Sequence, residues 1–258
     1  MNRIGKILHA AIVPFGILLI WEIWARIASD STRTLVLPAP TRIVQVMLEA
    51  LGQLPWWEMA GRTFGVTALG FALGSVCAIV VGIALGQSTF LARLINPSLL
   101  GLRSLPVVLY VPVALVLFNA GLQVPIALAA VVTTLYCAPP VARAVAEFDP
   151  EKRQFLHARG RTGASFYIGF VLPEIISALY LSLSLAVTLA LAVTVVAEIL
   201  LPSLDGLGTA IYRAREMNQY TRLWAMTGLL AIGGLLFHNM DLGLWRFAAP
   251  WLRNQRET

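Results

Sequence analysis

Residues 175–201, IISALYLSLSLAVTLALAVTVVAEILL, decide the class of this protein. The run holds a single acidic residue, Glu198, and its apolar residues do not alternate with polar ones. A helix needs about 20 mainly apolar residues to cross the hydrocarbon core of a bilayer. A transmembrane β-strand would instead alternate apolar and polar residues over a shorter segment. The run therefore predicts a membrane-spanning helix.

The whole chain shares this apolar character. Of its 258 residues, 58% are hydrophobic and 12% are charged, whereas soluble domains carry about 25% charged residues. We therefore predict an all-α membrane protein with about six transmembrane helices in a single domain. The predicted spans are residues 10–28, 63–85, 99–118, 124–146, 175–201 and 224–245.

The first span is interpreted as a retained helix rather than as a signal peptide. Arg3 and Lys6 precede it, but no small-x-small cleavage site follows closely. The run ends at Trp21, Glu22 and Trp24, and tryptophans gather at membrane interfaces.

Several other classes of function lack the residues they need. The net charge of +6 fits basic cytoplasmic loops, and no basic stripe with aromatics indicates nucleic-acid binding. Cys77 and Cys137 lie in apolar runs without a CxxC or Cys/His cluster, so we expect buried thiols and no metal site. No HExxH, GxSxG or GxxxxGK[ST] motif is present, so we expect neither an enzyme nor an ATP site on this chain.

Glycines and prolines inside the spans bear on packing. Gly70 and Gly74, and again Gly82 and Gly86, lie four residues apart and predict close helix–helix approach. Pro106, Pro112, Pro139 and Pro140 fall within the third and fourth spans. Each can bend its helix, either around a pathway or for packing alone.

The stretch 147–173, EFDPEKRQFLHARGRTGASFYIGFVLP, separates the fourth and fifth spans. Asp149-Pro150-Glu151 has the pattern of a helix start, and Gly160 and Gly163 would end or bend that helix. A short cytoplasmic helix is expected between them.

Two roles remain open for this short helix. Phe155 and Leu156 could enter a groove of a partner protein as apolar anchors. Alternatively, the helix could lie on the membrane surface, with its basic residues against lipid phosphates.

The same stretch resembles the cytoplasmic EAA loop of binding-protein-dependent ABC import permeases. That loop reads Glu-Ala-Ala, three residues, glycine, a spacer, an apolar residue, any residue and Leu-Pro. With Gly160 as the family glycine, Phe170 and Leu172-Pro173 have the expected offsets. The Glu-Ala-Ala positions then fall on residues 154–156, which do not match.

The alternative register takes Gly163 as the family glycine, places 157–159 at the Glu-Ala-Ala positions and shortens the later spacing by three residues. We prefer Gly160. The resemblance implies that the loop contacts an ATPase through the following residues: Gln154, Phe155, Leu156, His157, Ala158, Arg159, Gly160, Arg161 and Gly163.

Further matches extend the resemblance over nearly the whole chain, toward the nitrate, sulfonate and taurine importers. They are Leu37-Pro38-Ala39-Pro40-Thr41, Asn96-Pro97, Leu102-Arg103-Ser104-Leu105-Pro106, Tyr110-Val111-Pro112, Phe118-Asn119-Ala120-Gly121, Val196-Ala197-Glu198 and Gly206-Leu207-Gly208. Each match is weak alone, but their order and spacing together are specific.

The resemblance implies a type I importer fold in a bacterial inner membrane. It implies two permease copies, most simply a homodimer, and two ATP-binding subunits that hold ATP and magnesium. It also implies a periplasmic or lipid-anchored solute-binding protein, and no cofactor on this chain. Arginines and lysines favour the cytoplasmic loops modestly when both termini are cytoplasmic, and a helix from Thr41 to Leu51 would lie at the outer interface.

Four residues are tentative candidates for the translocation path: Glu198, Thr188, Thr194 and Asn119. Glu198 lines the path, extends to the membrane interface or caps a neighbouring helix, and the threonines either form a polar track or bond back to their own helix. A small anionic solute suits the resemblance, with nitrate, sulfonates, taurine and pyrimidine-like precursors all open. The alternative is a secondary transporter or channel, which would need mid-span coupling residues or inverted repeats.

Overall fold

The computed structural model describes residues 3–27 and 36–248 of the chain. No strand occurs in these residues. The helices in chain order are α1 (Arg3–Ile27), α3 (Pro40–Leu51), α4 (Leu54–Gln87), α5 (Thr89–Ser104), η1 (Val107–Leu109), α6 (Tyr110–Phe118), α7 (Gln123–Ala146), α8 (Pro150–Ala158), α9 (Ala164–Phe166), the π-helical η2 (Tyr167–Val171), α10 (Leu172–Leu200), η3 (Pro202–Leu204), α11 (Leu207–Glu216) and α12 (Tyr220–Ala248).

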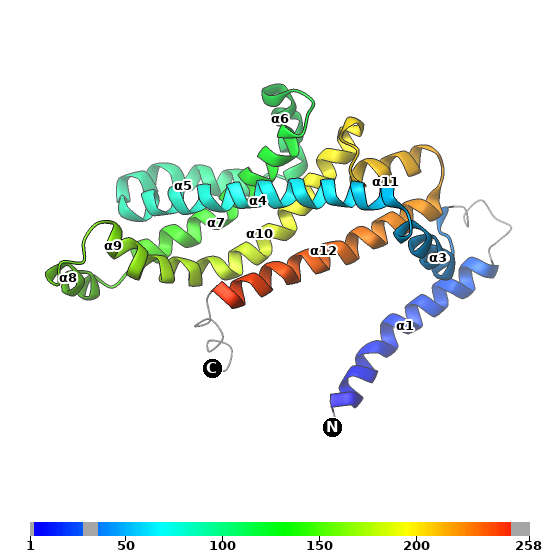
Figure 1. The fold of residues 1–258 in the computed structure, drawn as a ribbon, viewed down its shortest axis with the longest axis horizontal. Coiled ribbons are helices and arrows are strands. Elements are labelled where there is room, and N and C mark those ends of the chain that lie inside the picture. The colour runs from blue at the N-terminus through cyan, green and yellow to red at the C-terminus, as the bar shows by residue number, and fades with distance from the viewer. Residues whose placement is uncertain (1–2, 28–35, 249–258) are drawn as a thin grey trace.

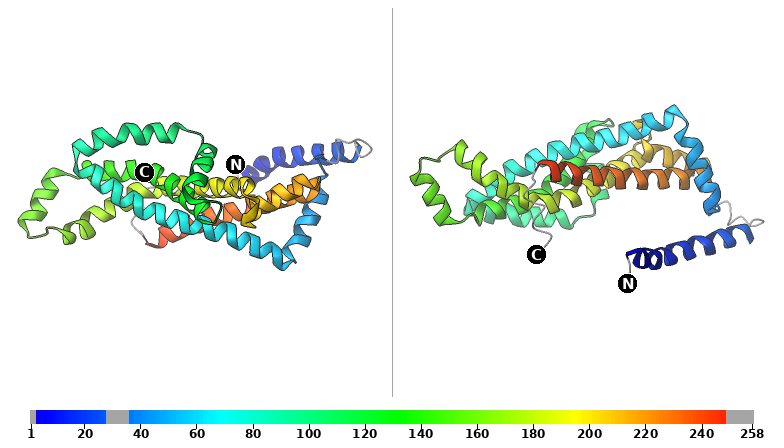
Figure 2. Two further views of the ribbon diagram at one scale, coloured as in Figure 1. Left: turned by 90° about the horizontal axis from the view of Figure 1, so that it is seen from above. Right: turned by 60° about the horizontal axis from the view of Figure 1, so that its bottom comes forward.

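Four long helices, α4, α7, α10 and α12, run along the length of an elongated bundle (Figure 1). The short helices α8 and α9 lie at one end of this bundle, and α3 and α11 lie at the other. α1 contacts the bundle next to α3 and diverges from it along the rest of its length, as Figure 1 and the right view in Figure 2 show.

The tightest helix pair is α4 with α7, as the glycine spacing predicted. α4 faces α7 with four glycines, and a Cβ atom at any of them would come within 2.6 Å of an atom of α7. These residues are Gly70, Gly74, Gly82 and Gly86. In addition, the Thr134 hydroxyl donates to the Gly74 carbonyl across the pair (3.1 Å). Small residues therefore let the two backbones approach closely, which is how helices associate in lipid.

The opposite face of α4 points away from the bundle, and the exposure of Cys77 on this face contradicts one prediction. Cys77 was expected to be buried, but it is exposed, whereas Cys137 on α7 is buried. The reason is that α4 buries only the stripe that contains its glycines and Ala78. In a membrane, lipid would cover the other face.

The third predicted span, 99–118, is wrong as a continuous helix. α5 ends at Ser104, and the chain turns by 101° before it continues through η1 and α6. Leu105 precedes Pro106 and is extended (φ −76°, ψ 137°), the backbone conformation that a following proline favours.

The described helices therefore give fewer clear spans than the six predicted. Four are long and apolar enough to cross a membrane, and α5 with η1 and α6 makes a fifth if the bent pair is one span. α1 covers the predicted span 10–28 up to Ile27, but its side chains are described only from Ile12 onward.

α3 begins at Pro40, one residue before the expected start at Thr41. The N-cap is Ala39, and Pro40 occupies the first turn, where a missing N–H costs nothing. Thr41 instead donates its backbone N–H (3.0 Å) and its hydroxyl (2.8 Å) to the Glu22 carboxylate of α1. These two hydrogen bonds to Glu22 hold the end of α1 against the start of α3.

Candidate coupling helix and translocation path

The helix predicted between the fourth and fifth spans is α8. A side-chain oxygen of Asp149 accepts hydrogen bonds from the backbone N–H groups of Glu151 (2.8 Å) and Lys152 (3.4 Å). Pro150 occupies the first turn. The predicted helix start is therefore confirmed, with an acidic cap at the positive end of the helix dipole.

The end of α8 depends on Gly160, which has a φ of +75°. The Gly160 N–H donates to the His157 carbonyl, and the Arg161 N–H donates to the Leu156 carbonyl, both at 3.0 Å. This pair of bonds is the Schellman motif, which ends a helix on a left-handed residue. Gly163 also has a positive φ, +58°, but lies beyond the helix in the following turn.

One face of α8 is open to a partner. Phe155 is 57% exposed, and the Arg159 guanidinium lies over its ring, 4.5 Å from the ring centroid. Three further predicted coupling residues, Gln154, Ala158 and Arg161, are also exposed; His157 is exposed too, but its ring packs on Phe166. The face therefore combines an apolar anchor with a cation stacked on it.

The other face of α8 packs on the bundle. Leu156 contacts the core cluster that contains Phe148 and Phe166, and Phe166 is 2% exposed. The rings of His157 and Phe166 form a T-shaped contact with 5.1 Å between their centroids. The rings of Phe148 and Phe166 form a second T-shaped contact with 5.4 Å between their centroids. Leu156 and Phe155, which were predicted to act together as anchors, thus lie on different faces.

A second group of polar side chains lies at the opposite end of the bundle, around Glu198 on α10. The Glu198 side chain is 3% exposed. The Thr63 hydroxyl of α4 lies 2.8 and 2.9 Å from its two oxygens, and the Gly208 N–H donates to one of them (2.8 Å). The Leu207 N–H donates in turn to the Thr63 hydroxyl (2.9 Å).

This arrangement caps α11 with the Glu198 carboxylate, because Leu207 and Gly208 are its first residues. Gly206 precedes them, and a Cβ atom there would overlap the carboxylate. Helix capping was one of the three roles left open for Glu198. Thr63 was not among the predicted site residues, because its partner Glu198 lies 135 residues away in the chain.

Three known proteins that are similar to this chain are all named as transport permeases. The chain is 21% identical over 257 residues, 99% of its length, to the whole formylaminopyrimidine transport permease ThiX of Halalkalibacterium halodurans. It is 24% identical over 243 residues, 90% of its length and 86% of the relative's, to the bicarbonate transport system permease CmpB of Synechococcus elongatus. SsuC of Escherichia coli, named for aliphatic sulfonates transport, is 24% identical over 93% of this chain and 89% of its own.

No family model matches the sequence. Among solved structures, the methionine ABC transporter MetNI in inward-facing conformations superimposes with a TM-score of 0.58. The match covers 75% of this chain and 96% of that one, at 20% sequence identity. The chain is a homologue of ABC transport permeases. The fold of the permease is accordingly that of an ABC importer permease.

The remaining candidates for the path do not gather in one cavity of the permease. Thr194 is buried, and its hydroxyl donates to the Ala190 carbonyl of its own helix (2.9 Å). Thr188 is exposed in an apolar groove of about 810 Å³ between α10 and α12. Asn119 is exposed at the end of α6, with a φ of +56°.

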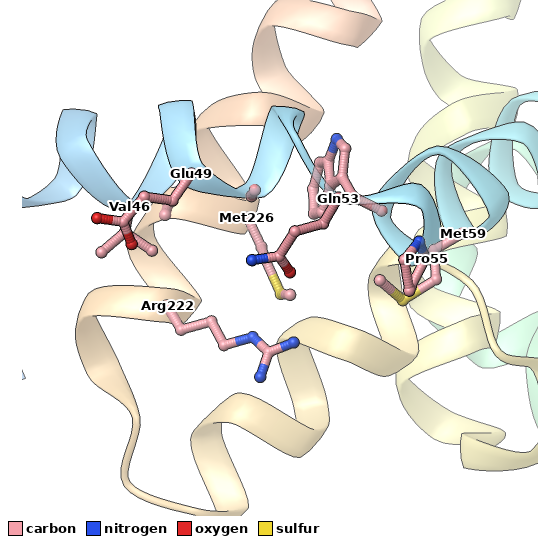
Figure 3. A pocket seen from close by; sticks show the side chains of 10 residues that line it. Val46, Glu49, Gln53, Pro55, Met59, Arg222 and Met226 are labelled. Carbon is pink, nitrogen blue, oxygen red and sulfur yellow. The ribbon is translucent and has the colours of Figure 1, made fainter.

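A polar cavity of about 240 Å³ lies between α3, α4 and α12, at the end of the permease far from α8. Figure 3 shows Arg222 and Gln53 pointing into it from different elements. A neighbouring cavity of about 670 Å³ shares Arg222 and adds Arg26 and Arg42. This end of the chain is therefore hollowed and lined by Arg42 and Arg222, while Glu49 also lines the first cavity and Arg26 is paired with Glu22 (2.6 Å).

No metal centre is indicated in the part of the permease that the structure describes. No group of three His, Cys, Asp or Glu side chains is placed there to hold an ion.

Proposed function

We propose that this permease passes a small anionic solute through the bacterial inner membrane when a separate ATPase subunit moves α8. The observation that carries this proposal is the structure of α8. Its outward face exposes Phe155 and Arg159, while its inward face packs Leu156 on the bundle core. A partner that holds the outward face can therefore push or pull the helices on the inward face.

In this proposal, the ATPase subunits supply the chemistry. Two copies bind ATP and magnesium below two permease copies, most simply a homodimer, and this chain holds no cofactor of its own. Its sequence lacks a phosphate-binding GxxxxGK[ST] loop. Bound ATP would stabilise one of two arrangements of the spans, and its tighter binding to the complex in that arrangement would drive the change from one arrangement to the other.

The proposed orientation places α8 in the cytoplasm. α1 and α12 each have one end beside α3 or α11 and run from there toward the α8 end (Figure 1). Both termini are then cytoplasmic, next to the basic residues of the 147–173 segment, which fits the distribution of positive charge in membrane proteins.

The opposite, hollowed end would then receive a periplasmic or lipid-anchored solute-binding protein. The cavities lined by Arg42 and Arg222 fit acidic side chains on such a partner. The anionic character of the solute is supported by the bicarbonate and sulfonate relatives. The formylaminopyrimidine relative leaves pyrimidine-like solutes within the proposal.

The test is purification of the tagged chain in mild detergent, followed by identification of the proteins that co-purify. We expect a soluble subunit with an ATP-binding loop. Gly160→Pro removes the N–H that ends α8 and forbids its positive φ, so we expect this variant to lose the subunit. Arg161→Glu should weaken the same association by reversing a charge beside α8.

A matched charge reversal, Arg215→Glu, lies on α11 at the far end and should leave co-purification unchanged. Retention of the ATPase by both loop variants would show that α8 is not the coupling element. A chain that purifies alone, from cells that still take up solute without ATP, would refute the proposal.

A further inference from the structure

The break between α5 and α6 exposes irregular backbone within a predicted span. Leu105 and Pro106 are non-helical, and the single 3₁₀ turn that follows, η1, begins with the bond from the Leu109 N–H to the Pro106 carbonyl. Leu105 and Leu109 are about half exposed. Non-helical backbone at membrane depth is tolerated only where it is buried in protein or lines a water-filled cavity. Lipid is therefore not the neighbour of this break.

An arginine lies at the same break. Arg103, in the last turn of α5, is half-buried, and its guanidinium lies 4.5 Å from the centroid of the Tyr136 ring. Tyr136 is near the middle of α7 and packs against three of the core clusters. The charge is thus directed toward the centre of the bundle and not toward a membrane interface.

A charge at this depth needs a counter-charge, because an unpaired ion in the membrane is costly. Among the described residues, no carboxylate forms an ion pair with Arg103. The sequence from 59 to 146, which includes α5, α6 and α7, contains no Asp or Glu, and neither does 175–197. Glu198, which directly follows the second of these segments, already accepts hydrogen bonds from Thr63 and Gly208.

We infer that Arg103 and the break at 105–109 line the translocation path, and that Arg103 attracts the transported anion there. The inference rests on the proposed function of the chain as a permease for small anions. Tyr136 positions the guanidinium by stacking on it, which leaves its N–H donors free for the oxygens of a carboxylate, sulfonate or bicarbonate. A second copy of the chain offers no acid at this depth in these segments, so the passing solute supplies the negative charge.

The experiment measures local water access and local potential with thiol reagents, and so does not require the solute to be known. Ser104→Cys places a thiol next to Arg103, at an exposed position, in a chain that also carries Cys77→Ala and Cys137→Ala. Leaky membranes from expressing cells are treated with an anionic reagent, sulfonatoethyl methanethiosulfonate, or a cationic one, trimethylammonioethyl methanethiosulfonate. The two reaction rates are compared.

We expect the thiol at 104 to react in the membrane and to prefer the anionic reagent. Arg103→Gln should lower the ratio of anionic to cationic rates by about tenfold, because a nearby positive charge favours one reagent and repels the other. Arg103→Lys should preserve the ratio. Arg93→Gln removes an exposed arginine at the other end of α5 and should also leave the ratio unchanged.

Two outcomes would overturn the inference. A thiol at 104 that reacts only after denaturation would show that no water-filled path reaches the break. A ratio that Arg103→Gln leaves unaltered, or that Arg93→Gln lowers as much, would show that Arg103 does not set the local potential. Neither outcome depends on ATPase binding, so failure of the co-purification test remains distinguishable.

Discussion

At one end of the bundle, the buried Glu198 carboxylate joins α10 to α4 and α11 through hydrogen bonds of 2.8 to 2.9 Å. At the other end, α8 is joined to the bundle by the packing of Leu156 and by ring contacts to Phe166. The first attachment is directional and excludes water. The second is apolar, adaptable and next to solvent.

The difference suggests different mechanical roles for the two ends. Buried hydrogen bonds with fixed geometry are costly to break, because each leaves a polar group without a partner. Ring contacts can slide by a small distance at little cost. We therefore expect α8 to move relative to the bundle, while the α4, α10 and α11 junction moves as one unit.

The largest effect is expected from Gly206→Ala. The added methyl group would overlap the Glu198 carboxylate and break its bonds, lowering the free energy of unfolding by about 3 kcal/mol. Thermal unfolding in detergent should show a midpoint lower by roughly 6–12 °C for a chain of this size. Gly65→Ala, where a Cβ meets no atom within 4 Å, should leave the midpoint unchanged. Equal behaviour of the two variants would remove the distinction between the ends.

Glu198→Gln should have a smaller effect of the same kind. The amide keeps the shape of the carboxylate, but its NH₂ group must face either the Thr63 hydroxyl or the Gly208 N–H. We expect a loss of about 2 kcal/mol, measured by the same thermal unfolding. Glu49→Gln, at an exposed acid on α3, should change stability by less than about 0.5 kcal/mol. If Glu198→Gln were as stable as the parent chain, the carboxylate would not hold this junction together.

Gly160→Ala should act at the α8 end and leave the rest of the bundle intact. Alanine at a φ of +75° costs about 1 kcal/mol, enough to reduce the affinity for the ATPase about fivefold. The midpoint of thermal unfolding should remain that of the parent chain. Gly52→Ala, at the end of α3 with a φ of −78°, is the matched control. A large fall in the midpoint with Gly160→Ala would show that α8 is part of the rigid unit.

The smallest effect is expected from Asp149→Ala, which removes the cap of α8. Loss of an exposed cap costs about 0.5–1 kcal/mol. Hydrogen exchange of the first α8 amides should accelerate about two- to fivefold. Glu147→Ala, an exposed acid that does not cap the helix, should leave these rates unchanged. Unchanged exchange in Asp149→Ala would mean that packing, and not the cap, holds the start of α8.

Local signals in the sequence predicted the features that depend on neighbouring residues. The Asp149-Pro150 start of α8, its end at Gly160 and the glycine face of α4 all follow from spacing and backbone preference, and all are confirmed. The interaction of Glu198 with Thr63 could not be predicted in this way, because the partners are 135 residues apart in the chain and Thr63 forms part of no motif.

The bend in the third span shows another limit of the sequence. Pro139 and Pro140 lie inside the continuous helix α7, whereas Pro106 lies at a break of 101°. Proline alone does not separate these outcomes, because packing against neighbouring helices can hold a proline-containing helix together. In the sequence, the polar pair Arg103 and Ser104 just before Pro106 distinguishes this site from Pro139 and Pro140. The predicted third span did not take this pair into account.

The glycine face of α4 also has a consequence for how the chain is made. Gly74 and its partner Thr134 are 60 residues apart, and a ribosome adding about 5–20 residues per second needs roughly 3–12 s to cover that distance. During this interval the glycine face of α4 has no α7 to pack against. We expect a truncated product that ends before α7 to keep this face uncovered and open to other membrane proteins, which distinguishes it from the finished chain.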